Sequence, residues 1–256
     1  QRCRHLFRDE LLERGRGTMR LTAKAEALRA PLKSLLASVI ELIDPPDVPL
    51  NEIRRTLRIT MSDYPALLVT ALLQQKLQKS APGIDVVIQP WHGADAARLQ
   101  LVQGSTDLAI SVFPPAQDEL HREELLVEHY MIAMRENHPA AANLSLETWL
   151  QYPHILVSGQ GNTRTAFDDD LARRQLTRRV GLVVPNFQIV PSLLRGSDMI
   201  AMLPSRIVAA EGGLVTFPPP IPVAGFALHL AWHSRQASDK ALQHVAAIVA
   251  SLLREG

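Results

Sequence analysis

The chain has 256 residues, of which 46% are hydrophobic, enough for a buried core in one large domain or two smaller ones. Its formal net charge is only +1, which argues against a protein that binds polyanions over its whole surface. The single cysteine, Cys3, excludes an intrachain disulfide and a metal site built from cysteines.

Neither a bilayer-spanning apolar stretch nor a signal-peptide pattern occurs in the sequence. We therefore expect a soluble protein of the reducing cytoplasm that has no membrane partner. The sequence starts at Gln1 in a segment with helical character, so we also expect the natural N-terminus to lie upstream.

The charge is concentrated near the N-terminus. Residues 1–35 carry nine Lys or Arg against four acidic residues, a net +5 that leaves −4 for the remainder. Within this segment Arg14, Gly15, Arg16 and Gly17 form a basic turn, where glycine permits a sharp bend and arginine can contact phosphate. The pattern predicts a nucleic-acid contact, with an exposed hairpin of solvated arginines as the alternative.

A helix is predicted directly after this turn, with Thr22 as its N-cap. Its apolar residues recur at spacings of 4, 3, 4 and 3, at Leu28, Leu32, Leu35, Val39 and Leu42. This seam favours pairing with a second helix, although a helix packed on its own domain has the same pattern. Pro31 predicts a kink or a restart, and residues 44–49 predict a stiff proline-rich hinge.

From Arg54 onward, predicted strands alternate with predicted helices. We expect strands at 57–61, 84–89, 107–113, 125–134, 154–158, 180–184, 199–203 and 226–233. We expect helices at 65–79, 94–103, 163–176, 190–195, 205–211 and 238–254, the last capped by Ser238. The alternation predicts parallel sheets covered by helices on both faces, which bind ligands at the carboxyl ends of their strands.

Catalytic signatures are missing: the sequence has no Gly-x-Ser-x-Gly, no glycine–lysine phosphate loop and no His-Glu-x-x-His. Residues 159–161 lack the lysine of a phosphate loop and are typical of a turn. His229 and His233 share a strand face without a neighbouring carboxylate, which favours packing over metal binding. Residues 168–170 suit a solvated helix start. The sequence therefore predicts no enzyme, no cofactor and no metal.

Three strand-to-helix junctions, at 61–65, 90–95 and 157–163, carry hydroxyl, aromatic or imidazole side chains. Helix N-termini with free N–H groups and nearby hydroxyls bind carboxylates and other small anions. Ser62 and Thr163, each taken alone, are explained equally well as helix caps. Together the three junctions favour a cleft for a small molecule.

Several segments resemble LysR-type transcriptional regulators. Residues 7–14, the basic turn and residues 20–22 resemble the wing and the linker-helix entry, and the Leu-Phe-x-Asp form is similar to the nodulation and aromatic-degradation branch. Residues 57–64 resemble the first effector-domain strand, 101–110 the helix-glycine-Asp-strand signature, and 137–139 the His-Pro after the crossover strand. These matches follow the order and spacing of the family, and together they cover essentially the whole chain.

The resemblance implies an α/β fold with a two-subdomain effector domain like periplasmic binding proteins, preceded by a winged-helix remnant and a linker helix. Residues 1–22 would end a winged helix-turn-helix, 23–49 would form the dimerisation helix and hinge, and 50–256 would bind the effector. Subdomain I would comprise 56–125 and 222–256, and subdomain II 126–221. Base-reading residues would precede Gln1, so the DNA contacts that can be named are Arg14 and Arg16.

The implied partners are double-stranded DNA, a second copy of the chain in a dimer or tetramer, RNA polymerase, and a small effector, expected to be an aromatic compound or an organic acid. The effector would lie between the subdomains and change the angle between them. The residues mapped to this cleft are Ser62, Asp63, Tyr64, Trp91, His92, Gly93, Phe113, His154, Ser158, Gly159 and Phe187.

Two other classes of protein would share this fold. A solute-binding protein of a transport system would have the same cleft, but the basic N-terminal segment and the missing signal peptide argue against it. An α/β enzyme would need a nucleophile paired with a base, which the sequence does not show.

Overall fold

The computed structural model describes residues 2–14, 18–43, 48–115, 119–208 and 212–255. Gly15, Arg16, Gly17 and residues 44–47 of the expected hinge lie outside the described residues. The chain divides into two compact units, residues 1–49 and residues 50–256, which are considered separately. In the described part of the chain, the helices are all too short or too polar to cross a membrane.

The first unit consists of a hairpin between two helices. It contains α1 (Arg2–Phe7), the antiparallel strands β1 (Leu12–Arg14) and β2 (Met19–Leu21), and α2 (Ala23–Ile43). Asp9 holds the hairpin to the start of α2, because its Oδ1 accepts from the Leu11 N–H at 2.7 Å and from the Thr22 hydroxyl at 2.6 Å. The Thr22 Oγ1 in turn accepts from the Ala25 N–H at 3.1 Å, which confirms Thr22 as the N-cap.

Helix α2 runs through Pro31 without a break, so of the expected kink or restart the restart was wrong and the kink stays a prediction. A proline removes one backbone donor, and the helical residues on both sides retain their conformation. The apolar seam faces solvent within this unit: Leu32 is 39% exposed, Leu35 60% and Val39 40%. The side chain of Leu42 lies outside the description.

The second unit contains two five-stranded sheets. We call the part built on the first sheet subdomain I, with strands in the order β4 (Ile84–Pro90), β3 (Arg55–Met61), β5 (Leu108–Ser111), β12 (Phe226–His233) and β6 (Leu120–Glu128). Subdomain II has the order β11 (Leu214–Phe217), β7 (Tyr130–Arg135), β10 (Ile200–Pro204), β8 (His154–Val157) and β9 (Val180–Val184).

Both sheets are mixed, which corrects the expectation of parallel sheets. Strand β12 pairs antiparallel with β5 and β6, and β7 pairs antiparallel with β10 and β11. The chain crosses from the first sheet to the second after β6 and returns to the first before β12. The first strand after each crossing, β7 or β12, runs antiparallel to the strands on both sides of it. The single strand expected at 125–134 is in fact two strands, which belong to different sheets and meet at His129.

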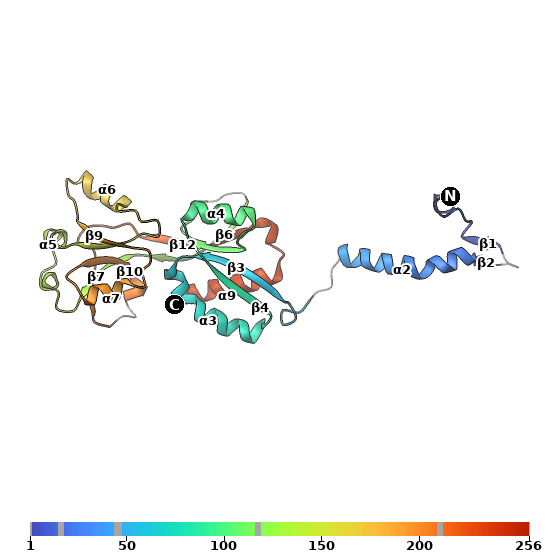
Figure 1. Cartoon of the computed structure of the whole chain (residues 1–256), viewed down its shortest axis with the longest axis horizontal. Coiled ribbons are helices and arrows are strands. Elements are labelled where there is room, and N and C mark those ends of the chain that lie inside the picture. Colours follow the sequence, from blue (N-terminus) through green and yellow to red (C-terminus); the bar gives the residue numbers. More distant parts are fainter. Residues whose placement is uncertain (1, 15–17, 44–47, 116–118, 209–211, 256) are drawn as a thin grey trace. The chain divides into compact units, whose positions relative to one another are not determined.

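Helices cover both faces of each sheet, as expected (Figure 1). In subdomain I, α3 (Asp63–Ser80) and α9 (Lys240–Glu255) cover one face and α4 (Ala94–Gln103) the other. In subdomain II, α7 (Val190–Arg195) and α8 (Ser205–Val208) lie opposite α5 (Leu146–Gln151) and α6 (Ala166–Arg173). Two short 3-10 helices, η1 (Pro139–Ala142) and η2 (Ser234–Gln236), complete the unit.

Several local expectations need correction. Helix α6 starts after Thr165 rather than at Thr163, and α5 and β11 were not expected at all. The cap of α9 is Asp239, not Ser238, because the Asp239 Oδ1 accepts from the Leu242 N–H at 3.1 Å. Part of the helix expected at 205–211 is α8, and residues 209–211 lie outside the described residues.

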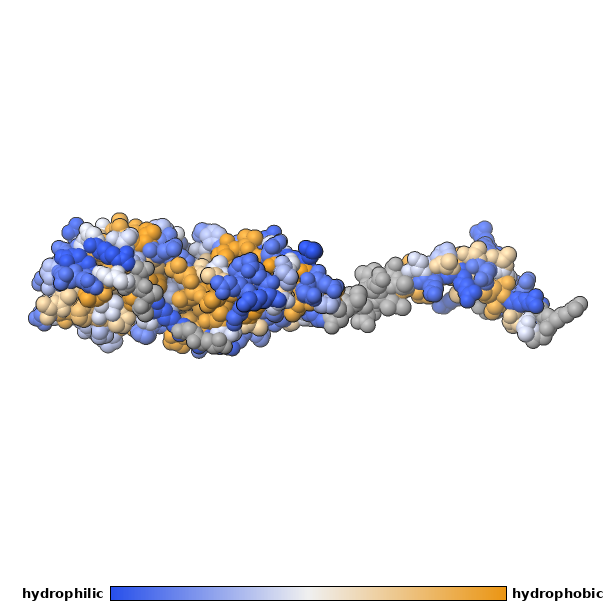
Figure 2. All heavy atoms as spheres, turned by 90° about the horizontal axis from the view of Figure 1, so that it is seen from below, coloured by the Kyte–Doolittle hydropathy of each residue, from blue (hydrophilic) through white to orange (hydrophobic). Residues whose placement is uncertain are grey.

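The hydrophobic surface is not confined to the first unit. Figure 2 views the molecule from the side on which α3 lies and shows hydrophobic residues there. On this helix Leu67 and Leu72 are each 48% exposed, whereas Val69, Leu73 and Leu77 are buried under it. The helix therefore carries apolar side chains on its outer face as well as on its inner face.

Among the described residues the chain passes between the two sheets twice, at His129 and at residues 218–225. The two crossover segments touch, because a Cβ added to Gly225 would lie 2.2 Å from the carbonyl oxygen of Glu128. Only glycine fits this close approach of two backbones.

Candidate functional site

Asp63 joins the two subdomains. It is the first residue of α3 in subdomain I, and its Oδ2 accepts hydrogen bonds from two backbone amides in the loop after β9 of subdomain II. The N–H of Phe187 donates at 2.6 Å and the N–H of Gln188 at 3.0 Å. A strand-to-helix junction of one subdomain is thus fastened to a strand-end loop of the other.

A second contact joins the other two junctions. The Gln160 Nε2 donates to the carbonyl oxygen of His92 at 2.8 Å. A Cβ on Gly93 would lie 3.2 Å from that amide nitrogen, and a Cβ on Gly159 would lie 3.9 Å from the Trp91 carbonyl oxygen. The turn after β8 therefore lies directly against the turn after β4.

Polar groups are available where these loops meet. Ser62 takes the N-cap position of α3 without a side-chain capping bond, while the Ser158 Oγ accepts from the Asn162 N–H at 2.9 Å. The Trp91 Nε1 donates to the Ser111 Oγ at 2.9 Å, which fixes the indole ring. The structure thus places most of the residues expected in the cleft at the boundary between the subdomains: Ser62, Asp63, Tyr64, Trp91, His92, Gly93, Ser158, Gly159 and Phe187.

Two of the expected cleft residues lie elsewhere. Phe113 is 6% exposed and packs behind Trp91 in the apolar cluster beneath α4. His154 is fully buried in subdomain II, where its ring meets Trp149 edge-on and its Nε2 lies 3.1 Å from the Trp149 carbonyl oxygen. Burial, helped by the nearby charge of Arg178, lowers the pKa of His154 to about 4. We therefore leave His154 out of the candidate site.

Glu128 is a functional candidate that no sequence pattern indicated. Its side chain is 1% exposed, and it accepts from the Tyr64 hydroxyl, the His129 N–H (2.8 Å), the Ser205 hydroxyl (2.6 Å) and the Ser205 N–H (3.2 Å). Burial raises the pKa of Glu128, but the donors led by Ser205 and Tyr64 outweigh burial and hold the pKa below its usual value.

This carboxylate ties both subdomains to the first crossover. Tyr64 belongs to α3 of subdomain I, and Ser205 begins α8 of subdomain II. Burial and the bond to Glu128 raise the pKa of the Tyr64 phenol, so the phenol stays a donor. The ring of Tyr64 meets Phe187 and Phe226 edge-on, each at 6.4 Å between centroids.

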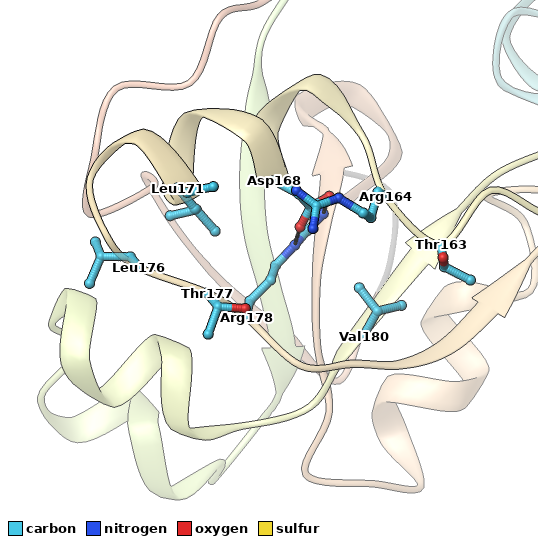
Figure 3. Close-up of a pocket in the computed structure, with 9 residues that line it drawn as sticks. Thr163, Arg164, Asp168, Leu171, Leu176, Thr177, Arg178 and Val180 are labelled. Atoms are coloured by element: carbon cyan, nitrogen blue, oxygen red, sulfur yellow. Dashed lines mark hydrogen bonds and ion pairs between the residues drawn. The ribbon is translucent and has the colours of Figure 1, made fainter.

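Two cavities flank helix α6. One, of about 290 Å³, lies between α6, strands β8 and β10, Phe187 and the second crossover. The other, of about 280 Å³, lies between α6 and the segment that follows it, and is shown in Figure 3. Arg178 borders both cavities and reaches toward Asp168 of α6.

Asp168 was expected at a solvated helix end, and the structure corrects this. Its carboxylate completes a capping box with Thr165 and accepts from Arg178 through Nε at 2.7 Å and Nη2 at 3.0 Å. The Arg178 side chain is 1% exposed and that of Asp168 11%, so the ion pair is buried. Burial raises the pKa of Asp168, but the bonds from Arg178 and Thr165 outweigh it, and the pKa lies below its usual value.

Two mixed α/β subdomains joined by paired crossovers are also the fold of the effector binding domain of a BenM variant, with a TM-score of 0.59 at 16% identity. The family model described as the LysR substrate binding domain matches residues 50–254. The chain therefore belongs to the LysR family of transcriptional regulators, which confirms the resemblance and sets aside the enzyme and transport alternatives.

Curated relatives agree with this assignment. The chain is 27% identical over 248 residues to the HTH-type transcriptional activator NahR of Pseudomonas putida, covering 94% of this chain and 82% of that protein. It is also 27% identical over 245 residues to the HTH-type transcriptional regulator SyrM of Rhizobium meliloti (strain 1021), covering 93% and 74%.

Solved structures show the same architecture. The probable transcriptional regulator PA0477 from Pseudomonas aeruginosa has a TM-score of 0.67 at 25% identity, covering 97% of this chain and 85% of that chain. The regulatory domain of MexT, a transcriptional activator in the same organism, has a TM-score of 0.66 at 26% identity, covering 78% and 98%.

Proposed function

We propose that this LysR-family regulator binds operator DNA, contacting it through Arg14 and Arg16, and is switched by a small aromatic compound or organic acid held between subdomains I and II. The observation that carries the proposal is the meeting of the three strand-to-helix junctions at the subdomain boundary. Loops from both subdomains contact each other there, through Asp63 on one side and Gln160 on the other. A ligand at this boundary would touch both subdomains at once.

Such a ligand acts as a switch if it binds one arrangement of the subdomains more tightly than another. Trp91 supplies an aromatic face, His92 is exposed, and Ser62 offers a hydroxyl without a capping bond. These groups suit a ring compound with a polar substituent better than a sugar.

The N-terminal unit supports the DNA-binding part of the proposal. Arg14 ends β1 at the turn of the hairpin and is exposed, so it can contact phosphate; Arg16 lies outside the described residues. The exposed seam of α2 supports self-association, because Leu32, Leu35 and Val39 would be covered by the same helix of a second copy.

Thermal unfolding of the chain in the presence of small aromatic compounds, phenols as well as carboxylic acids, tests the effector site. A ligand at one hundred times its Kd should stabilise the protein by roughly 2.7 kcal/mol and raise its Tm. Trp91→Ala and His92→Ala should abolish most of this rise, whereas Leu99→Ala, on the exposed face of α4, should not. An unchanged rise in the Trp91 and His92 variants would contradict the proposed site.

The salt dependence of binding to duplex DNA tests the DNA-binding part of the proposal. Affinity should fall as salt rises, and Arg14→Ala should reduce the slope of log K against log salt by about one. Arg174→Ala, which removes an exposed arginine of subdomain II, serves as the control. Binding that does not depend on salt would contradict the assignment of the hairpin to DNA.

A further inference from the structure

We propose that the 290 Å³ cavity beneath α6 binds an uncharged aromatic compound that carries a hydroxyl or carbonyl oxygen, and disfavours aromatic carboxylates. The inference rests on the proposed function in one respect, since it names a chemical class of effector. The cavity reaches the subdomain boundary at Phe187 and the second crossover, but Trp91 and His92 do not line it, so its occupant is tested by variants of its own. Binding to the cavity itself requires no DNA and can be measured alone.

The size and the walls of the cavity fit aromatic rings. An apolar cavity of about 150 Å³ is large enough for benzene, so about 290 Å³ has room for two fused rings. Val157 of β8, Met202 of β10, Phe167 of α6 and Phe187 provide apolar wall from four segments. Methionine adapts to irregular shapes, and aromatic rings pack edge-to-face on a bound ring.

The charges of the cavity argue against an acid. Among the described residues that border it, Arg178 is the only cation and Asp170 the only anion. Arg178 is already paired with Asp168 through two short hydrogen bonds. Asp170 is half exposed and paired with Arg173, so it offers a ligand anion no cation. A ligand carboxylate would therefore have to share the Arg178 guanidinium with the buried carboxylate of Asp168, and burying an uncompensated negative charge is costly.

The same guanidinium can still bind a neutral oxygen. Arginine has five N–H groups, and Asp168 accepts from two of them. The carbon of the guanidinium lies 5.1 Å from the centroid of the Phe167 ring, which holds the group at the cavity wall. A ligand hydroxyl or carbonyl oxygen can accept from a remaining N–H without bringing a charge.

The mouth of the cavity is marked by two small exposed residues. Ala166, at the start of α6, and Ala224, in the second crossover, both border the cavity and are exposed. Because these side chains are exposed, a larger residue at either position can close the entrance without displacing core residues.

Calorimetric titration of the chain at neutral pH, without DNA, compares two probes with the same ring system: 2-naphthol, which is neutral, and 2-naphthoate, which is charged. We expect 2-naphthol to bind with at least a tenfold lower Kd, a difference of about 1.4 kcal/mol. A Kd for 2-naphthoate equal to or lower than that for 2-naphthol would overturn the proposal, as would the absence of binding by 2-naphthol up to its solubility limit.

Two variants locate the site. Ala166→Trp should weaken the binding of 2-naphthol at least tenfold, while Ala172→Trp, the same substitution on the same helix at the border of the other cavity, should change it less than twofold. The reverse pattern would overturn the assignment. Circular dichroism melting confirms that both variants fold. Binding of 2-naphthol that leaves DNA affinity unchanged would contradict the proposed function but support the cavity.

Discussion

Glu128 is a carboxylate surrounded by donors and placed where the two subdomains and the first crossover meet. Four hydrogen bonds compensate its removal from water, two from Ser205 and one each from Tyr64 and His129. Hydrogen bonds to a charged group are worth more than neutral ones, and an acceptor surrounded by donors cannot be replaced by a group that also donates.

We therefore expect Glu128→Gln to lower the free energy of unfolding by roughly 2–3 kcal/mol, because the amide nitrogen would face a donor. Urea unfolding measures the change. Glu136→Gln, at an exposed site, makes the matched control and should stay within about 0.5 kcal/mol of the parent chain. A variant as stable as that control would show that the network contributes little to stability.

The buried pair of Asp168 and Arg178 gives a pH-dependent contribution. Because the pKa of Asp168 is lower in the folded than in the unfolded chain, its contribution is present above about pH 4, the unfolded value, and is lost as the pH falls through the folded pKa. Asp168→Asn should lower stability at pH 7 by roughly 3 kcal/mol, and this difference should shrink on acidification.

Urea unfolding at a series of pH values between 2 and 7 measures this trend, with Asp169→Asn as the control because its side chain is 62% exposed. The control should follow the parent chain at every pH. A difference between Asp168→Asn and the parent that does not change with pH would contradict the assigned role of the carboxylate.

Among the elements, α2 carries the clearest expectation. In an isolated chain its exposed leucines contribute no free energy of burial, whereas pairing with a second helix would bury them. On the proposed pairing of α2 with a second copy, Leu35→Glu should shift the chain from dimer toward monomer, and Ser34→Glu, away from the seam, should not. Analytical ultracentrifugation at micromolar concentration measures the populations, and an unchanged dimer in the Leu35 variant would exclude this face as the interface.

The hydrophobic pattern predicted most elements because local periodicity determines helix or strand. The bounds of α4, β9, α7 and β12 agree with expectation to the residue. The passage from β6 to β7 could not be seen, because no glycine or proline interrupts residues 125–134. The change of sheet at His129 depends on pairing with β12 on one side and with β10 and β11 on the other, all distant in sequence.

Side-chain roles were harder to predict than elements. Ser238 and Asp239 are both good caps, and only the register of α9 decides between them. Asp168 looked solvated because its partner, Arg178, comes ten residues later on the far side of a turn. The rule that α/β sheets bind ligands at the carboxyl ends of their strands predicted which loops form the candidate site. No sequence pattern indicated the backbone amides that Asp63 binds, because any residue other than proline has such an amide.

At the scale of the whole molecule, the two hydrogen bonds that Asp63 accepts connect the subdomains, and a single substitution removes both. Asp63→Ala leaves the amides of Phe187 and Gln188 without their acceptor. Their hydrogen exchange should accelerate at least tenfold, because a less restrained boundary opens more often. Asp95→Ala, in the exposed first turn of α4, is the control. Unchanged protection of the two amides would show that the boundary is held by other contacts.

The contact between the two crossovers has a mechanical consequence. Because the backbone at Gly225 touches the carbonyl of Glu128, the covalent links between the described parts of the subdomains pass through one small region. If the proposed effector changed the angle between the subdomains, the axis of that rotation would pass through this region. A shift of the nearby loops by a fraction of an ångström would then give a larger displacement at the ends of both subdomains, which lie farther from the axis.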